Sequence, residues 1–329
     1  MRNVMLRCLL AGVLVVLGAV TVVVSAEQEK AASAPAPAAA PSGLPAIALA
    51  AGVKHPFLCA DNGNGKVFVV SADGKVEWEF PAGVPQDVWR LPNGNYLFSH
   101  TRGVKEVTPD AAKKVVWEYK SPDKTEVHNC QPLPDGSVFI AECGTSRFIE
   151  IDREGKIVKE LKIETQGGTH RQFRLARKLP SGHYLAALNG ERIVREYDGD
   201  GKVLRTIQVP GDPYAALRLP NGNTLISCGD GHKVIEVDPQ DKVVWSLDEN
   251  DLPGNPLRFV AGIQRLPNGN TVVCNWGGHG HVGQQPEVFE VTPDKKVVWQ
   301  VDDYKTFKTI SGIQILDVKG DVTQGEIPR

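Results

Sequence analysis

The sequence predicts an all-β fold, a six-bladed β-propeller made of four-stranded antiparallel blades. Two features of its 329 residues predict this fold. A Leu-Pro-x-Gly turn recurs at spacings of 40 to 47 residues, which is the length of one propeller blade. Three alternating apolar runs follow each turn, and the last two of them also stand once before the first turn, which gives six units. The turns begin at Leu91, Leu133, Leu179, Leu219 and Leu266.

The unit around Leu219 shows how one blade is built. The turn is followed by the alternating run NTLIS, then by VIEVD at residues 234–238 and, across a short turn, by VVWSL at residues 243–247. Asn-Gly and Asp-Gly between alternating apolar runs favour tight hairpins, so neighbouring runs pair as antiparallel strands. Together with the strand that precedes the turn, each unit forms a four-stranded meander.

The C-terminal segment is expected to complete the ring. The run SGIQILD at residues 311–317 repeats the pattern of AGIQRLP at residues 261–267, which leads into the last Leu-Pro-x-Gly turn. The N-terminal unit lacks this first strand, so we expect the C-terminal run to supply it. Such closure leaves the ring without a long open edge.

The N-terminal residues 1–26 have the pattern of a secretory signal peptide. Basic residues precede an apolar run at residues 8–24, and small residues favour cleavage after Ala26. An uncleaved anchor is the alternative, although the run is slightly short for the about 20 residues of a bilayer span. Residues 27–45 are rich in Ala and Pro and predict an extended linker, and residues 46–329 form the propeller. We expect a secreted or periplasmic protein with no membrane span after cleavage.

Composition limits the ligands and cofactors. The net charge of −2 gives no electrostatic footprint for nucleic acid. An odd number of cysteines after residue 26 argues against a disulfide framework, and the lack of a Cys-x-x-Cys pair argues against structural zinc. We predict buried thiols, no metal, no cofactor and a monomeric state. These cysteines are Cys59, Cys130, Cys143, Cys228 and Cys274.

Residues that recur at one position in most blades are predicted to serve the scaffold. A glutamate recurs in the third strand, and we expect it to pair with the neighbouring blade. A tryptophan recurs in the fourth strand, and we expect it to pack between blades. The glutamates are Glu106, Glu150, Glu196, Glu236 and Glu290, and the tryptophans are Trp78, Trp117, Trp245 and Trp299.

Alternating strand directions assign every loop to one of the two faces of the ring. The Leu-Pro-x-Gly turns lie on one face, and the second-to-third-strand loops and the blade connections lie on the other. Six of the eight histidines fall on this second face, which is called the histidine face below. Because loops on a rigid scaffold carry function, we predict the ligand site there. The six are His100, His128, His170, His232, His279 and His281.

The ends of the innermost strands align when residues are counted back from each Leu-Pro-x-Gly turn. At five and four residues before the Leu, blades two to four carry mostly polar residues, and the other three blades carry mostly small ones. This asymmetry predicts an off-centre pocket with room for a ligand. The pocket residues predicted on this basis are Gln86, Asp87, His128, Asn129, Arg174 and Tyr214.

Basic residues gather at another shared offset. Arg171, Arg258 and Lys308 each stand eight residues before a Leu, beside the predicted channel mouth. On a weakly acidic protein they indicate an anionic ligand, such as a carboxylate, a sulfate or a phosphate ester. The alternative is a set of solvated loop charges balanced by Asp212, Asp230 and Glu142.

The second-to-third-strand loop of the sixth blade lies within CNWGGHGHVGQQPEVFE, residues 274–290, and is longer than its counterparts. An insertion on the ligand-facing side favours a role in specificity. We therefore include Asn275, Trp276, His279 and His281 among the ligand-binding residues, with Trp276 as a platform for a sugar or an aromatic ring. Two histidines alone are too few to predict a metal site.

The unit LPNGNTLISCGDGHKVIEVDPQDKVVWSL resembles the repeats of PQQ-like and arylsulfotransferase-like propellers, and the resemblance covers all six units. The arylsulfotransferase resemblance implies a histidine that accepts a sulfuryl group and an arginine that stabilises the developing charge. On this chain the acceptor would be His128 or His170, with Arg174 or Arg171 as its partner. The catalytic motif of that family is not matched residue by residue.

Two functions are consistent with these residues. The first is an exported module that binds a small or polymeric anionic ligand, a small molecule or a carbohydrate, at the histidine face. The second is an enzyme of the arylsulfotransferase type, or a sugar lyase or hydrolase with a histidine as general base, for which His128, His170 and Arg174 are the catalytic candidates. A quinoprotein dehydrogenase is least favoured, because such enzymes usually have eight blades and an adjacent cysteine pair.

Overall fold

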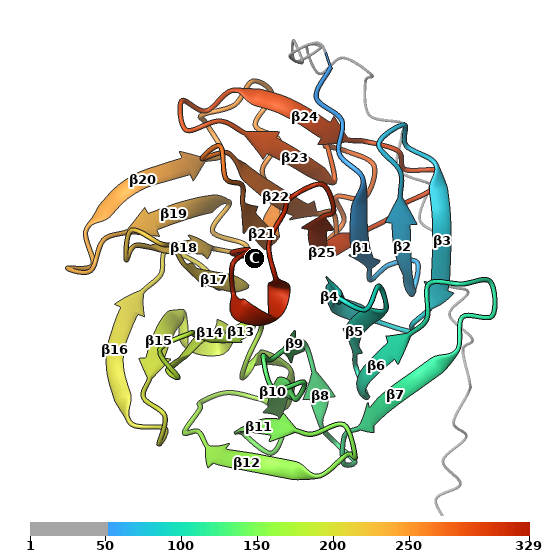
Figure 1. Ribbon diagram of the computed structural model, residues 1–329. Coiled ribbons are helices and arrows are strands. Elements are labelled where there is room, and N and C mark those ends of the chain that lie inside the picture. Colours follow the sequence, from blue (N-terminus) through green and yellow to red (C-terminus); the bar gives the residue numbers. More distant parts are fainter. Residues whose placement is uncertain (1–51) are drawn as a thin grey trace, which may run out of the picture. The chain divides into compact units, whose positions relative to one another are not determined.

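The computed structural model describes residues 52–329, so the predicted signal peptide and linker lie outside the described residues. Six antiparallel sheets stand around a central axis as the blades of a propeller (Figure 1). This confirms the predicted six-bladed β-propeller. Within residues 52–329 no helix is long and apolar enough to cross a membrane.

In each of the first three blades the strands follow one another from the axis outward. Blade one contains β25 (Ile310–Ile315), β1 (Phe57–Asp61), β2 (Lys66–Val70) and β3 (Val76–Pro81). Blade two contains β4 (Pro85–Arg90), β5 (Tyr96–His100), β6 (Gly103–Val107) and β7 (Val115–Lys120). Blade three contains β8 (Glu126–Val127), β9 (Gln131–Pro132), β10 (Val138–Cys143), β11 (Arg147–Ile151) and β12 (Ile157–Lys162).

The remaining blades follow the same order. Blade four contains β13 (Ala176–Lys178), β14 (Tyr184–Leu188), β15 (Ile193–Tyr197) and β16 (Val203–Gln208). Blade five contains β17 (Ala215–Arg218), β18 (Thr224–Ser227), β19 (Lys233–Val237) and β20 (Val243–Asp248). Blade six contains β21 (Phe259–Arg265), β22 (Thr271–Trp276), β23 (Val288–Val291) and β24 (Val297–Val301). The short 3-10 turns are η1 (Thr169–Arg171), η2 (Asn189–Glu191) and η3 (Val322–Gln324).

Blade one is built from both ends of the propeller sequence. Strand β25 pairs antiparallel with β1, with Phe57 opposite Ile315 and Ala60 opposite Gly312. The other edge of β1 pairs with β2, so β25 takes the innermost place in the blade (Figure 1). The predicted closure by the C-terminal run is therefore confirmed.

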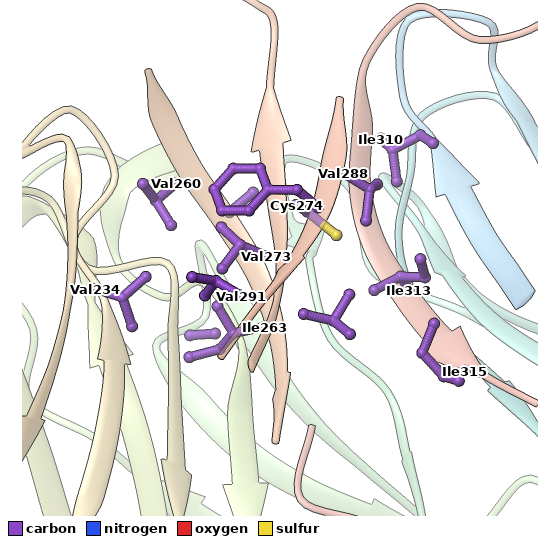
Figure 2. Packing of buried hydrophobic residues seen from close by; sticks show 14 of the residues in the cluster. Val234, Val260, Ile263, Val273, Cys274, Val288, Val291, Ile310, Ile313 and Ile315 are labelled. Atoms are coloured by element: carbon purple, nitrogen blue, oxygen red, sulfur yellow. The ribbon is translucent and has the colours of Figure 1, made fainter. Parts of the chain in front are cut away.

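Apolar side chains fill the spaces between the blades. Figure 2 shows Val273 and Cys274 of β22 and Val288 of β23 in the core, between Val234 of blade five and Ile313 of β25. The apolar positions of the alternating runs supply this packing, since successive side chains of a strand point to opposite faces of its sheet. The predicted cysteines are all buried free thiols, as expected from their apolar surroundings.

The recurring glutamates join each blade to the next, as predicted. Each ion pair joins a glutamate in the third strand of one blade to a basic residue of the following blade. In the last pair, Glu290 of blade six contacts His55, which lies beside blade one. These pairs therefore belong to the scaffold. They are Arg153 with Glu106, Lys178 with Glu150, Arg218 with Glu196, Arg265 with Glu236 and His55 with Glu290.

The recurring tryptophans also contact the following blade. Trp117 lies 5.5 Å from the guanidinium of Arg153, and the Trp117 indole donates a hydrogen bond to the carbonyl of Asp152. Trp299 packs edge-on against Phe57 of β1, with 5.7 Å between ring centroids. The predicted packing between blades is confirmed.

His55 ties blade six to the end of β25. Its Nε2 donates to Glu290 at 2.9 Å and its Nδ1 donates to Asp317 at 3.0 Å, so both ring nitrogens face carboxylates. Burial alone lowers the pKa of His55, but the hydrogen bonds to Glu290 and Asp317 outweigh burial and raise the pKa above 6.5.

We expect His55→Gln to lower the free energy of unfolding most at low pH. The raised pKa means that protonated His55 stabilises the fold fully below pH 6.5 and that this contribution is lost as the pH rises through the folded-state pKa. Below pH 6.5 the loss should be about 1.5–3 kcal/mol. Chemical denaturation of both proteins at a series of pH values checks this. A difference that grows with pH would contradict it.

Candidate functional site

A cavity of about 500 Å³ opens on the histidine face at one end of the central channel. The second-to-third-strand loops and the blade connections supply most of its walls. The predicted residues that line it are Gln86, His170, Arg171, Arg174, Tyr214, Trp276 and His279. The others are Asn62, Val84, Asn189, Asp212, Asp230, Phe259 and Ser311.

Irregular inner strands shape this end of the channel. In blade three the inner strand is split into β8 and β9, and the side-chain oxygen of Asn129 accepts a hydrogen bond from the backbone N–H of Ala141 at 2.9 Å in the gap. In blade four, η1 precedes the inner strand and carries His170 and Arg171. Breaks of this kind redirect side chains that a regular ladder would point into the sheet.

Arg174 is a nearly buried cation without an anionic partner. Its side chain is 9% exposed, and no carboxylate of residues 52–329 lies within 4.0 Å of its guanidinium. Its Nη1 donates to the carbonyl of His170, and its Nη2 lies 3.0 Å from Nε2 of His170. Burial lowers the pKa of Arg174, which reflects the cost of holding this charge away from water.

Arg171 differs from Arg174 because its charge is already balanced. Its Nη2 lies 3.2 Å from Asp212, and Asp212 also accepts from Arg192 at 3.1 Å. The alternative of balanced loop charges therefore describes Arg171. It does not describe Arg174.

Glu126 orients the exposed imidazole of His170. The Oε2 atom of Glu126 lies 2.7 Å from Nδ1 of His170. An arginine N–H can only donate, so the His170 nitrogen that faces Arg174 accepts and the proton of the neutral ring lies on Nδ1, toward Glu126. The Nε2 lone pair therefore faces the Arg174 guanidinium.

His128 lies behind this pair and is 2% exposed. Its Nε2 lies 3.0 Å from the same Glu126 oxygen, and its Nδ1 lies 3.1 Å from Nη1 of Arg174. Burial lowers the pKa of His128. Hydrogen bonds, first from His128 and then from His170, lower the pKa of Glu126 to about 2.

Glu126, His128 and His170 also bring three potential metal-ligand atoms within 4.8 Å of one another. Coordination through Nδ1 of His170 would move the ring proton to Nε2, where it would face an N–H of Arg174. The Arg174 guanidinium thus disfavours metal coordination at this cluster.

Aromatic side chains form the opposite wall of the cavity. Trp276 and His279 lie edge to face with 5.1 Å between centroids, and Phe259 packs against Trp276 at 5.2 Å and against Tyr214 at 5.8 Å. Asp230 lies 3.2 Å from Nδ1 of His279. The cavity therefore combines a cationic wall with an aromatic wall.

A hydrogen bond and an ion pair close the channel below the cavity. Tyr214 donates to the side-chain oxygen of Gln86 across the channel. Asp87 is fully buried and accepts from Arg177 at 2.9 and 3.2 Å, with Arg329 3.6 Å away. Asp87 thus lies outside the cavity lining, although it follows Gln86 directly.

Several other predicted residues support the loops and do not line the cavity. Buried Asn275 donates to the carbonyls of Pro256 and Pro286, and its oxygen accepts from the backbone N–H of Arg258 at 2.8 Å. The guanidinium of Arg258 donates to the carbonyls of Asn255 and Leu257.

The two other histidines of the prediction also lie outside the lining. His281 is half-buried, and its Nδ1 lies 3.2 Å from the side-chain oxygen of Gln284. Burial lowers the pKa of His100 to about 4, and its Nε2 has no hydrogen-bond partner among the described residues.

Glu126 and Phe259 are the main residues that the sequence analysis missed. Glu126 stands two residues before His128, and a Glu-x-His pair beside a channel mouth was a usable signal. Phe259 follows Arg258 directly, at the start of β21, and an apolar residue there gave no sign that it faces a ligand site.

Comparisons with known proteins are consistent with the fold. The chain resembles a protein of unknown function from Bacteroides caccae, with 31% identity, a TM-score of 0.72 and coverage of 79% of this chain and 98% of that one. A catalytically inactive virginiamycin B lyase from Staphylococcus aureus with quinupristin gives 12% identity, a TM-score of 0.54 and coverage of 77% and 86%. A functionally unknown protein from Desulfotomaculum acetoxidans gives 14% identity, a TM-score of 0.53 and coverage of 80% of this chain and 86% of that one.

The last two structural similarities show the propeller fold alone, because the sequence identity of these proteins to the chain is so low. No curated protein matches the chain. The family model described as Mal s 1 allergenic protein-like matches residues 66–296, which includes strands from all six blades. The chain therefore belongs to the Mal s 1 allergenic protein-like family.

Proposed function

We propose that the protein binds a small organic anion in the cavity of the histidine face. The observation that carries this proposal is Arg174, a nearly buried guanidinium with no carboxylate of the described residues within 4.0 Å. A buried charge without a partner costs several kcal/mol. An anionic ligand would offset that cost with charge-assisted hydrogen bonds.

The rest of the cavity favours an acid attached to a ring. A volume of about 500 Å³ suits a small molecule. The acid group would lie on Arg174 beside His170, and a sugar or aromatic ring would lie against Trp276 and Phe259 on the opposite wall. Carboxylates, sulfate esters and phosphate esters of such rings are the ligand classes that we infer.

The N-terminal pattern extends the proposal to the place of action. We infer that residues 1–26 direct export, that residues 27–45 act as a tether, and that binding takes place in a periplasm or outside the cell.

The second candidate function is catalysis by His170, and the orientation of this ring by Glu126 favours it. A carboxylate that accepts from Nδ1 orients the ring, and Nε2, which accepts from Arg174, becomes available as a general base once a bound anion takes over that N–H. With a carboxylate substrate on Arg174, Nε2 of His170 could take a proton from the adjacent carbon while the guanidinium stabilises the resulting negative charge. Departure of the glycosidic oxygen from the next ring carbon, with a proton taken up from solvent, would complete a β-elimination, so this chemistry fits a uronate lyase. Sulfuryl transfer of the arylsulfotransferase type, with His170 as acceptor, stays a prediction.

A thermal-shift screen against uronates, sulfated sugars and aryl sulfates tests the binding function. A ligand at about 100 times its dissociation constant adds about 2.7 kcal/mol, which raises Tm by a few degrees. We expect Arg174→Gln to weaken binding by about 30-fold or more, because a buried charged contact is lost. Arg192→Gln, whose side chain is 68% exposed, is the matched control and should keep the shift.

Two results would count against the binding function. One is a panel without any shift, and the other is a shift that survives in Arg174→Gln. For catalysis, His170→Ala should abolish turnover while largely retaining ligand binding. If no panel compound is converted while binding depends on Arg174, the protein is a binding module.

A further inference from the structure

A group of acidic side chains lies at the seam between blades six and one, outside the cavity lining. Asp61 ends β1, Glu287 directly precedes β23, and Asp302 and Asp303 directly follow β24. Within residues 52–329, no basic side chain forms an ion pair with any of these four carboxylates within 4.0 Å. Among the described residues, none of these four carboxylates therefore has a basic side chain in direct contact.

Glu287 differs from its acidic neighbours because nothing satisfies it. Asp61 accepts from the backbone N–H groups of Asn64, Lys308 and Thr309. Glu287 is 1% exposed, and neither of its carboxylate oxygens has a hydrogen-bond partner among the described residues. Burial first, then Asp61, Asp303 and Asp302, raise the pKa of Glu287 to about 8.

Gln285 provides an independent observation at the same place. It is 3% exposed, and its side-chain oxygen also lacks a partner among residues 52–329. The Tyr304 hydroxyl donates to the backbone carbonyl of Gln285. Burial and then the charge of Glu287 raise the pKa of the same Tyr304. Unsatisfied buried oxygens are rare in native proteins, and an unseen ion is one of their few explanations.

We propose that this cluster is a calcium site in which the Glu287 carboxylate and the side-chain oxygen of Gln285 are ligands. The available donors are all oxygens, which suits a hard cation, and Ca²⁺ accepts irregular sets of 6–8 oxygens that include carbonyls and water. The acidic neighbours Asp61, Asp302 and Asp303 add attraction for a cation.

The site goes beyond the proposed ligand binding, because it concerns the closure of the ring. Glu287 lies between β22 and β24, with its N–H donating to Val301 and its carbonyl accepting from Asn275. Residues 302–309 lead from β24 to β25, the strand that closes blade one. A bound ion would hold the long loop of blade six against this connection.

Titration with CaCl₂ tests the site. The purified protein is treated with a chelator, exchanged into metal-free buffer and titrated by calorimetry, and its thermal unfolding is followed with and without CaCl₂. We expect one strong site per chain and a rise in Tm of a few degrees. Glu287→Gln, which keeps the shape of the side chain, should weaken Ca²⁺ binding at least 30-fold and abolish the rise. The matched control Glu77→Gln, at an exposed residue, should behave as the wild type.

Three results would overturn the proposal. They are no response of the wild type to CaCl₂, an unchanged response in Glu287→Gln, and a response lost in Glu126→Gln but kept in Glu287→Gln. The last would place the ion at Glu126, His128 and His170. If Glu287→Gln does not fold, Gln285→Ala replaces it, with a weakened response as the expected result and an unchanged one as the contradiction.

Discussion

Deletion of residues 311–329 is expected to abolish cooperative folding. The deletion removes almost all of β25, the innermost strand of blade one, and exposes the edge of β1. It also removes Ile313 and Ile315, which are almost fully buried against blade six and β1. Each buried aliphatic side chain contributes about 1.5–3 kcal/mol, and a domain has only about 5–15 kcal/mol in total. The lost strand pairing adds to this.

Chemical denaturation followed by circular dichroism checks this prediction. The truncated protein should be insoluble, or should unfold without a cooperative transition. Deletion of residues 318–329 is the control, because it keeps β25 and should leave a folded but less stable propeller. A truncation at residue 310 that stayed soluble and unfolded cooperatively would contradict closure by the C-terminal strand.

Asp87→Ala is expected to lower the free energy of unfolding by about 3–5 kcal/mol, because it leaves buried guanidinium groups without an anion. Asp87 is the acidic partner of Arg177 and lies near Arg329, and all three side chains are buried. The two guanidinium groups also lie 5.0 and 4.0 Å from the ring of Trp89, so their positions are fixed on several sides.

Urea denaturation measures this loss. Asp123→Ala removes a fully exposed carboxylate that pairs with Arg102, and it should leave the unfolding free energy unchanged. A loss below about 1 kcal/mol for Asp87→Ala would match a surface ion pair and would contradict the structural role of Asp87 below the cavity.

The fold could be predicted from the sequence because a propeller repeats one local solution. Each blade needs its own alternating strands, so the pattern of its third and fourth strands occurs six times in the sequence. The same repetition separated scaffold from site. Glu106 and Trp117 recur in other blades, and both proved to contact the following blade.

The candidate site could be predicted in part. Counting back from the turns identified Gln86, Arg174 and Tyr214, since equivalent positions of inner strands reach the same depth in the channel. The count failed to separate Gln86 from Asp87, because adjacent residues face different surroundings and Asp87 pairs with Arg177, 90 positions away. Pairing of this kind depends on how the blades meet around the axis.

Other features of the site could not be predicted from periodicity. Glu126 precedes the break between β8 and β9, and such a break cannot be predicted from the repeat pattern. The isolation of Arg174 is a property of its three-dimensional surroundings, since Arg171 stands three residues earlier and is balanced by Asp212. The unsatisfied carboxyl group of Glu287 is likewise visible only once its neighbours are placed.

The most direct test of the proposed function is a crystal structure of the protein with the anion that gives the largest thermal shift. We expect the acid group of the anion to lie within hydrogen-bond distance of the Arg174 guanidinium, beside Nε2 of His170. The ring of the ligand should lie against Trp276 and Phe259. An anion bound elsewhere, with the Arg174 guanidinium still contacting only His128, His170 and the carbonyl of Phe173, would contradict the central claim.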